Sequence, residues 1–278
     1  MSNPMLRDFG AQKGARPQQG QYEQNGRIYD YAQGAGQTAS ADQLQGMYDQ
    51  AAAGPAQTGR MTMTDVVMRT SMTLGTVIVM AVVGWYVPAL AIPGAIIGLV
   101  LGLVNAFKRE PSPVLIMVYA AAEGAFLGGL SMIMETTEYQ GIVVQAVIGT
   151  LGVAGVVLVL NQLGILRSSP VLTKIVLVAM LGYLVFGLVN LGLSVFAGFN
   201  MRSDVSIPGT DLPLGLLIGA VAILLASYSL VLDYENIRNG IGRVPAKYAW
   251  SAAFGLTVTL IWLYVEILRI LALFNSND

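Results

Sequence analysis

The sequence predicts an all-α membrane protein in which seven transmembrane helices form a compact bundle. Of the 278 residues, 55% are hydrophobic and only 11% are charged, whereas an ordinary soluble protein has about a quarter charged residues. From residue 65 onward the apolar residues form seven long segments, each near the roughly 20 residues that a helix needs to cross a bilayer. Their hydrophobicity is continuous rather than alternating, which disfavours a transmembrane β-barrel.

The first 64 residues have a different character from the rest of the chain. They are rich in Gln, Gly and Ala and contain few large apolar residues. Such a segment cannot bury enough apolar surface to fold alone, so we expect residues 1–64 to be a disordered cytoplasmic tail. Residues 65–278 are expected to form the seven-helix transmembrane domain.

Prolines and short polar loops separate the seven expected spans. The spans cover residues 66–87, 89–107, 113–134, 142–163, 175–199, 214–237 and 250–274. In the second span Gly94, Gly98 and Gly102 share one helix face, and in the third span Gly124 and Gly128 do the same. Small residues at this spacing let helix backbones approach closely in a membrane, so the bundle is expected to be compact.

The basic residues predict the orientation of the bundle. If the tail is cytoplasmic, the inner loops hold seven basic residues, namely Lys108, Arg109, Arg167, Lys174, Arg238, Arg243 and Lys247. The outer connections hold only Arg202, beside the acidic residues Glu135, Glu138, Asp204 and Asp211. Cytoplasmic loops of membrane proteins carry an excess of Lys and Arg, so the N-terminus is expected inside and the C-terminus outside.

Composition excludes several classes of function. The chain has no cysteine and no histidine, so disulfides, thiol chemistry, Cys/His zinc sites and Ser-His or Cys-His catalysis are excluded. A formal charge of −1 argues against a nucleic-acid partner, which requires a basic face. No phosphate-binding loop, nucleophile–base pair or GxGD-like motif of an intramembrane aspartyl protease is present. We therefore expect no enzyme and no cofactor, and the lipid bilayer is the expected partner.

Three acidic residues lie within the apolar segments. Glu123 falls near the middle of the third span, Asp233 near the inner end of the sixth, and Glu266 in the outer half of the seventh. An ionisable residue at such depth is expensive and marks a functional site by default. Each has a plainer interpretation. Glu123 could bond to a neighbouring helix, Asp233 could sit at the interface, and Glu266 could pair with Arg269 one turn away.

Neutral polar residues suggest three levels of polar groups across the bilayer. By depth, Asp233 falls with Asn105, Glu123 with Thr259, and Glu266 with Asn190. A sparse series of carboxylates, hydroxyls and amides suits a cation or proton better than a bulky solute. The same pattern would arise if each polar group satisfied a neighbour. A proton-coupled transporter is a weaker alternative, because no internal repeat is evident.

The sixth and seventh spans resemble a known family. SLVLDYENI at residues 229–237, KYAW at 247–250, LYVEIL at 263–268 and the following Arg269 resemble the C-terminal half of the Bax inhibitor-1/YccA-like family, also called the transmembrane Bax inhibitor motif family. The tail and the NAFKREPSP turn at residues 105–113 are similar to its bacterial branch. The resemblance implies six helices around a central seventh, and location in the bacterial inner (plasma) membrane.

The resemblance also implies a function. Such proteins are described as calcium-permeable, pH-sensitive leak channels, and some as regulators of cell death or of membrane proteases. We therefore expect a calcium leak channel gated by intramembrane carboxylates. The alternative is a non-conducting regulatory protein that binds a partner such as a membrane protease.

Family site residues can be placed on this chain in part. The family senses pH with an aspartate near the end of the sixth helix, matched by Asp233, and a second in the seventh. The motif LYVEI aligns that second acid with Glu266, but counting from KYAW or from Arg269 puts it at Val258 or Thr259. Arg109 and Lys108 are the nearest candidates for the basic residue that closes the family's pore. Helical rise separates Asp233 from Glu266 by about 15 Å, which argues against a direct pair.

Overall fold

The structure is a computed structural model that describes residues 23–24, 27–28, 58–137, 140–209 and 212–275. The chain divides into two compact units, Met1–Ala52 and Ala53–Asp278. In the first unit, β1 (Glu23–Gln24) pairs antiparallel with β2 (Arg27–Ile28). Most of the predicted tail lies outside the described residues, as do Glu138 and Asp211, two of the acidic residues used for the orientation.

The second unit contains seven helices that are long and apolar enough to cross a membrane, within the part of the chain described. These are α2 (Met63–Tyr86), α3 (Ala91–Phe107), α4 (Pro113–Thr137), α5 (Ile142–Gln162), α6 (Pro170–Ala197), α7 (Leu214–Gly240) and α8 (Ala249–Asn275). Short 3-10 turns, η3 (Pro88–Leu90) and η4 (Ala246–Tyr248), precede α3 and α8. The predicted all-α, seven-helix membrane fold is confirmed.

Helix ends differ from the sequence prediction where capping residues extend them. α6 begins at Pro170 rather than near residue 175, because the Ser169 hydroxyl accepts a hydrogen bond from the Leu172 N–H and proline suits the first helical position. α2 begins at Met63, where Thr62 and Asp65 form a reciprocal capping box. Polar side chains that an apolar-segment prediction ignores therefore set these boundaries.

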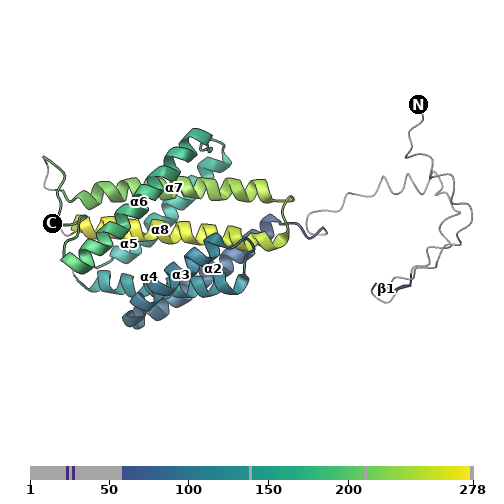
Figure 1. Ribbon diagram of the computed structural model, residues 1–278, viewed down its shortest axis with the longest axis horizontal. Helices are drawn as coiled ribbons and strands as arrows, with labels where there is room; N and C mark the ends of the chain where they lie inside the picture. The colour runs from purple at the N-terminus through teal and green to yellow at the C-terminus, as the bar shows by residue number, and fades with distance from the viewer. Residues whose placement is uncertain (1–22, 25–26, 29–57, 138–139, 210–211, 276–278) are drawn as a thin grey trace, which may run out of the picture. The chain divides into compact units, whose positions relative to one another are not determined.

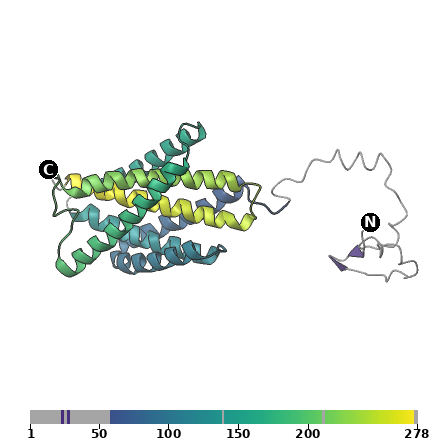
Figure 2. The same ribbon diagram turned by 45° about the horizontal axis from the view of Figure 1, so that its top comes forward.

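Helix α8 occupies the middle of the bundle. It packs against α2, α4, α5 and α7, whereas α3 packs on α4 and α6 on α7. Figure 1 shows α8 running between α7 on one side and α2 to α4 on the other. Figures 1 and 2 both show α6 crossing the bundle obliquely. The last helix is therefore central, as expected, but four helices rather than six pack against it, with α3 outside α4 and α6 outside α7.

Glycine allows the close approach of α2, α3 and α4. A side-chain carbon at Gly94 would lie 2.6 Å from the backbone oxygen of Ala122, and one at Gly124 would lie 2.4 Å from that of Val77. Neither backbone oxygen can move away cheaply, so these positions require glycine. A glycine of α3 thus allows α3 to approach α4, and a glycine of α4 allows α4 to approach α2.

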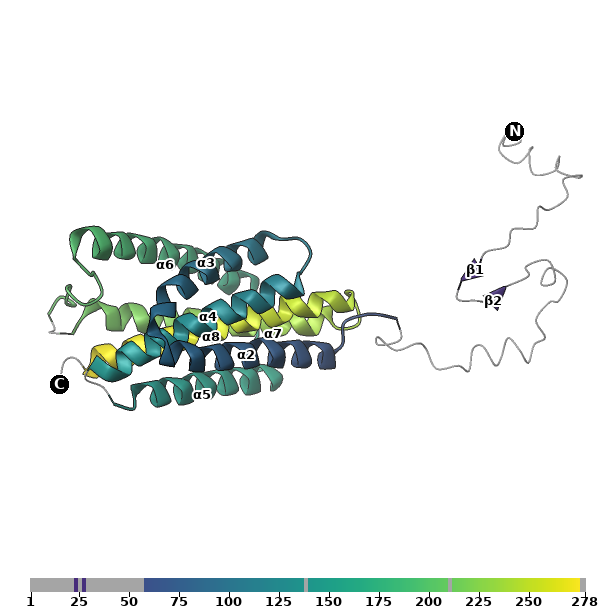
Figure 3. The same cartoon turned by 90° about the horizontal axis from the view of Figure 1, so that it is seen from below.

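The loops form two ends of the bundle that differ in charge. We call the end formed by residues 58–62, 108–112, 163–169 and 241–248 the basic end, and the opposite one the far end. At the basic end, the Met61 N–H donates to the Val244 carbonyl at 2.8 Å, and the Gly242 N–H donates to the Met61 carbonyl at 2.9 Å. Residues 58–64, which the sequence assigns to the tail, are therefore docked on the loop before α8. Figure 3 shows the bundle from below.

Candidate functional site

Asp233 and Thr259 meet in the interior of the bundle. Asp233 lies on α7, seven residues before that helix ends, and Thr259 is a buried residue of α8. The Thr259 hydroxyl donates a 2.7 Å hydrogen bond to Oδ2 of Asp233. Gly255, one turn earlier on α8, makes room, since a side-chain carbon there would lie 3.3 Å from Oδ1. Of the two alignments, the one that places the second family position at Thr259 matches this geometry.

A cavity leads from the basic end to the Asp233 carboxylate. It has a volume of about 300 Å³, and its lining includes Asp233, Asn236, Ser251 and Gly255. Asn236 and Ser251 are exposed, so the cavity reaches the surface. No Lys or Arg forms an ion pair with Asp233 anywhere in the described ranges. The cavity therefore ends at a carboxylate that has a hydroxyl donor but no counter-charge.

A polar stripe on α2 faces the same part of α8. The hydroxyls of Thr73 and Thr257 lie 2.9 Å apart in the buried interface. Closer to the basic end, Arg69 forms an ion pair with Asp65, donates to the Ala246 carbonyl and lies over the Trp250 ring. The four-residue spacing of Asp65, Arg69 and Thr73 is the sequence signal of this shared polar face.

Glu266 lies in a separate cluster toward the far end. It is 1% exposed and accepts hydrogen bonds from two arginines, Arg269 at 2.5 Å and Arg202 at 3.2 Å, and from the Tyr183 hydroxyl. The predicted Glu266–Arg269 ion pair is confirmed. Arg202 and Tyr183 were missed, because they lie 64 and 83 residues away in the sequence.

Arg202 is an unusual part of this cluster, because it belongs to the loop between α6 and α7. Its guanidinium lies 2.9 Å from the Tyr183 hydroxyl and stacks on the rings of Tyr183 and Phe186, with centroids 5.4 and 5.5 Å away. Asn190 helps to hold the loop, because its Oδ1 accepts the Met201 N–H at 2.8 Å. The far end thus places two guanidinium charges around one buried carboxylate.

The two carboxylates are separate sites. Asp233 is hydrogen-bonded to Thr259, so it lies at the height of Thr259 along α8. Glu266 is seven residues further along that helix, a rise of about 10 Å. This is less than the 15 Å expected from the sequence, since α8 brings Thr259 level with Asp233, but it still rules out a direct pair in this structure.

The other predicted site residues lie apart from Asp233. The Glu123 carboxylate lies against Gly98 of α3 rather than beside Thr259. Asn105 donates to the Leu101 carbonyl of its own helix. Lys108 and Arg109 are exposed at the basic end. Residues predicted to share a depth are therefore not in contact in these two cases, because Glu123 faces α3 and Asn105 bonds within its own helix.

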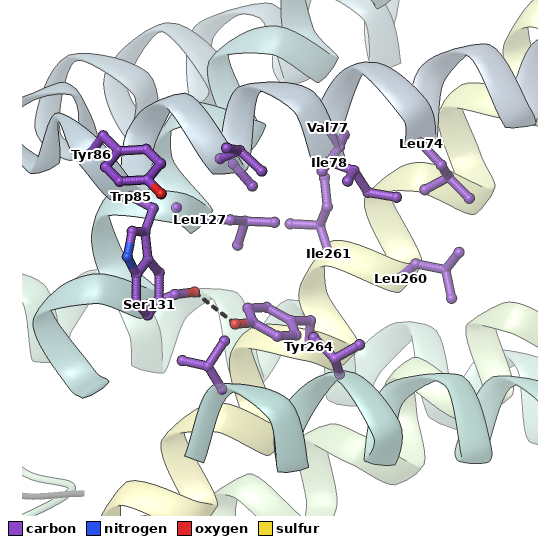
Figure 4. A pocket seen from close by; sticks show the side chains of 15 residues that line it. Leu74, Val77, Ile78, Trp85, Tyr86, Leu127, Ser131, Leu260, Ile261 and Tyr264 are labelled. Atoms are coloured by element: carbon purple, nitrogen blue, oxygen red, sulfur yellow. Dashed lines mark hydrogen bonds between the residues drawn. The ribbon is translucent and has the colours of Figure 1, made fainter. Parts of the chain in front are cut away.

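A second cavity, of about 560 Å³, lies between α2 and α5 over α4 and α8. Its lining is mostly apolar, and the oxygens of Ser131 and Tyr264 within it lie 2.6 Å apart. Figure 4 shows these two side chains pointing toward each other, with Trp85 and Tyr86 nearby. No acidic side chain lines this cavity, so it lacks the carboxylate that distinguishes the Asp233 cavity.

No fixed metal site accompanies these carboxylates. Within the described residues, no group of three or more Asp and Glu side chains is close enough to hold a metal ion. Any cation that meets Asp233 would therefore meet one carboxylate and neighbouring hydroxyl and carbonyl groups. Such a site suits weak, transient contact better than stable binding.

Comparison with known proteins agrees with this architecture. No curated protein matches the chain. The family model described as Bax inhibitor 1 like matches residues 3–276. Since the match covers nearly the whole sequence, the chain belongs to the Bax inhibitor 1 like family of membrane proteins.

Proposed function

We propose that the protein is a pH-sensitive leak channel for cations, with calcium as the transported ion, in the inner membrane of a bacterium. The observation that carries the proposal is the Asp233 carboxylate at the end of a cavity that reaches the basic end. A carboxylate without a counter-charge in a membrane interior attracts cations. In a chain without histidine, carboxylates are the side chains available to change charge as the pH falls.

The far-end cluster would form the closed end of such a path. The Arg202 and Arg269 side chains both contact Glu266, so one of two positive charges there is uncompensated. A cation that had passed Asp233 would meet this positive charge about 10 Å further along α8. The path would open when the Arg202 loop or α8 moves. Neutralising Asp233 would remove the attraction that draws cations into the cavity from the basic end.

The orientation of the proposed path follows from the charge bias. The basic end carries most of the Lys and Arg residues outside the helices, and in multi-spanning proteins that end faces the cytoplasm. The tail would then be cytoplasmic, and the Arg202 loop would face the outside.

The test is calcium flux into vesicles that contain the purified full-length protein and a calcium-sensitive dye. We expect flux above that of empty vesicles, with a pH dependence that Asp233→Asn abolishes. Glu110→Gln is the matched control, because Glu110 is an exposed loop carboxylate outside both clusters, and the hydrogen bond from Lys247 lowers its pKa. Wild-type flux equal to that of empty vesicles would refute the channel, and an unchanged profile in Asp233→Asn would refute the role of Asp233.

The alternative is a non-conducting regulator that binds a membrane protein partner such as a protease. It is favoured by the docking of residues 58–62 at the mouth of the Asp233 cavity, where Met61 is part of the lining. Deleting residues 1–57 separates the two functions. Flux survives this deletion if the seven-helix unit is a channel, whereas partner binding is lost if the tail recruits the partner.

A further inference from the structure

A third cavity, at the basic end, has a different chemistry from the two described above. It has a volume of about 430 Å³ and lies between the end of α5, the loop 163–169 and the end of α7. Its lining is polar and consists of Asn161, Arg167, Glu235, Arg238 and Asn239. None of these residues belongs to the Asp233 cavity or to the Glu266 cluster.

A buried amide with an unused acceptor faces this cavity. Asn161 is only 2% exposed, and its Nδ2 donates to the Leu166 carbonyl at 3.0 Å. Its Oδ1 is buried and has no hydrogen-bond partner within the described part of the chain. Buried polar atoms are nearly always satisfied, so an unpaired acceptor in a polar cavity indicates a ligand that donates a hydrogen bond.

The charges of the cavity favour an anion. Arg167 and Arg238 are exposed, and neither forms an ion pair in the described ranges. The Glu235 carboxylate is held by the loop, since it accepts hydrogen bonds from the N–H and hydroxyl of Ser168. Two guanidiniums and one carboxylate leave a single positive charge, which matches one phosphodiester. Arginine also suits phosphate, because its N–H groups bond to two oxygens at once.

The surroundings indicate that the ligand comes from the membrane. Leu163 and Ile165, on the same loop as Arg167, are 68% and 67% exposed. Large apolar side chains beside arginines at the end of a transmembrane bundle suit the boundary between lipid headgroups and acyl chains. Basic pockets between transmembrane helices are known to hold phospholipid headgroups.

We propose that this cavity binds the headgroup of a phospholipid of the adjacent leaflet. Arg167 and Arg238 bind the phosphodiester, and Asn161 accepts a hydrogen bond from a hydroxyl or ammonium group of the same headgroup. Glu235 acts through Ser168 by fixing the loop that carries Arg167. The inference does not depend on cation conduction.

The test is retention of added lipid by the purified full-length protein in detergent, measured by native mass spectrometry. Phosphatidylglycerol is the probe, and diacylglycerol, which lacks the phosphate, is the comparison. We expect phosphatidylglycerol alone to be retained, and retention to fall about tenfold or more in Arg167→Gln/Arg238→Gln. Arg243→Gln is the matched control, because it removes an exposed arginine at the same end outside the cavity.

A second variant and a soluble probe complete the experiment. Asn161→Leu places an apolar side chain of similar size at this buried position. It removes the acceptor together with the hydrogen bond to the Leu166 carbonyl, and it should also weaken retention. If the double variant does not fold, Arg167→Gln alone decides the outcome, since this side chain is exposed and forms no ion pair in the described ranges. Equal retention by the arginine variants and Arg243→Gln would overturn the site. Glycerophosphoglycerol binding as tightly as the lipid would overturn the assignment to a membrane lipid.

Discussion

Replacing Glu266 by glutamine tests whether the far-end cluster stabilises the fold. The substitution removes the buried carboxylate and leaves Arg202 and Arg269 without an anion. Breaking a buried ion pair by removing one partner destabilises a protein by about 3–5 kcal/mol. Arg202 keeps the Tyr183 hydroxyl at 2.9 Å and two aromatic rings, so we expect the lower figure, about 3 kcal/mol. For a domain of this size, that predicts a fall in Tm of about 6–12 °C.

The assay is thermal unfolding of the detergent-solubilised protein, followed by tryptophan fluorescence at neutral pH. Glu110→Gln is the matched control, because Glu110 pairs with Lys247 at 2.7 Å on the surface. The hydrogen bond from Lys247 lowers the pKa of Glu110. Any stability that the Glu110–Lys247 pair contributes is therefore fully present above the ordinary pKa of a glutamate, about 4.3. It is lost only as the pH falls through the lowered pKa of Glu110. At neutral pH the control pair is intact, and its loss should not change Tm measurably.

A double variant shows whether the effect comes from the ion pair itself. Arg202→Gln/Glu266→Gln removes both charges, so it should lose less stability than the sum of the two single variants. The reasoning fails if Glu266→Gln unfolds at the same temperature as Glu110→Gln, or if the two single effects add.

Two further predictions concern helix packing and the Asp233 site. Gly128→Ala should lower stability by about 1–3 kcal/mol, because its new side-chain carbon would overlap the Ala81 backbone. Gly152→Ala, which meets nothing within 4 Å, should unfold like the wild type, and equal losses would contradict the packing argument. Thr259→Asp should make calcium flux in vesicles more strongly pH-dependent, since two carboxylates at hydrogen-bond distance share one proton. An unchanged profile would show that position 259 does not act with Asp233.

Much of the fold could be predicted because it depends on local properties of the sequence. Span length and continuous hydrophobicity place seven helices in a bilayer without any knowledge of tertiary contacts. The spacing of Gly94 and Gly98, and of Gly124 and Gly128, predicts which faces approach closely. Helix ends were less accurate at Ser169 and Thr62, because single hydrogen bonds from capping side chains decide them.

The candidate site could be predicted only in part, because it depends on helix rotation and on a loop. Depth along a span follows from residue counting, but the direction of Glu123 toward α3 depends on how α4 turns between its neighbours. Arg202 lies in a polar loop, where charge statistics assign it to the outside. Its insertion beside Glu266 requires the backbone of the loop to be held by Asn190, and no spacing in the sequence indicates that contact.

The pairing of Asp233 with Thr259 changes what a pH response in this chain can involve. Two adjacent carboxylates repel each other when both are ionised, and that repulsion is a source of pH sensitivity. Here the partner at 2.7 Å is a hydroxyl, which donates to the carboxylate and carries no charge. Repulsion within a dyad is therefore absent, and the charge of Asp233 alone acts on a cation in the cavity. In the proposed channel, conduction would then depend on the balance between this carboxylate and the uncompensated guanidinium charge beside Glu266, about 10 Å along α8.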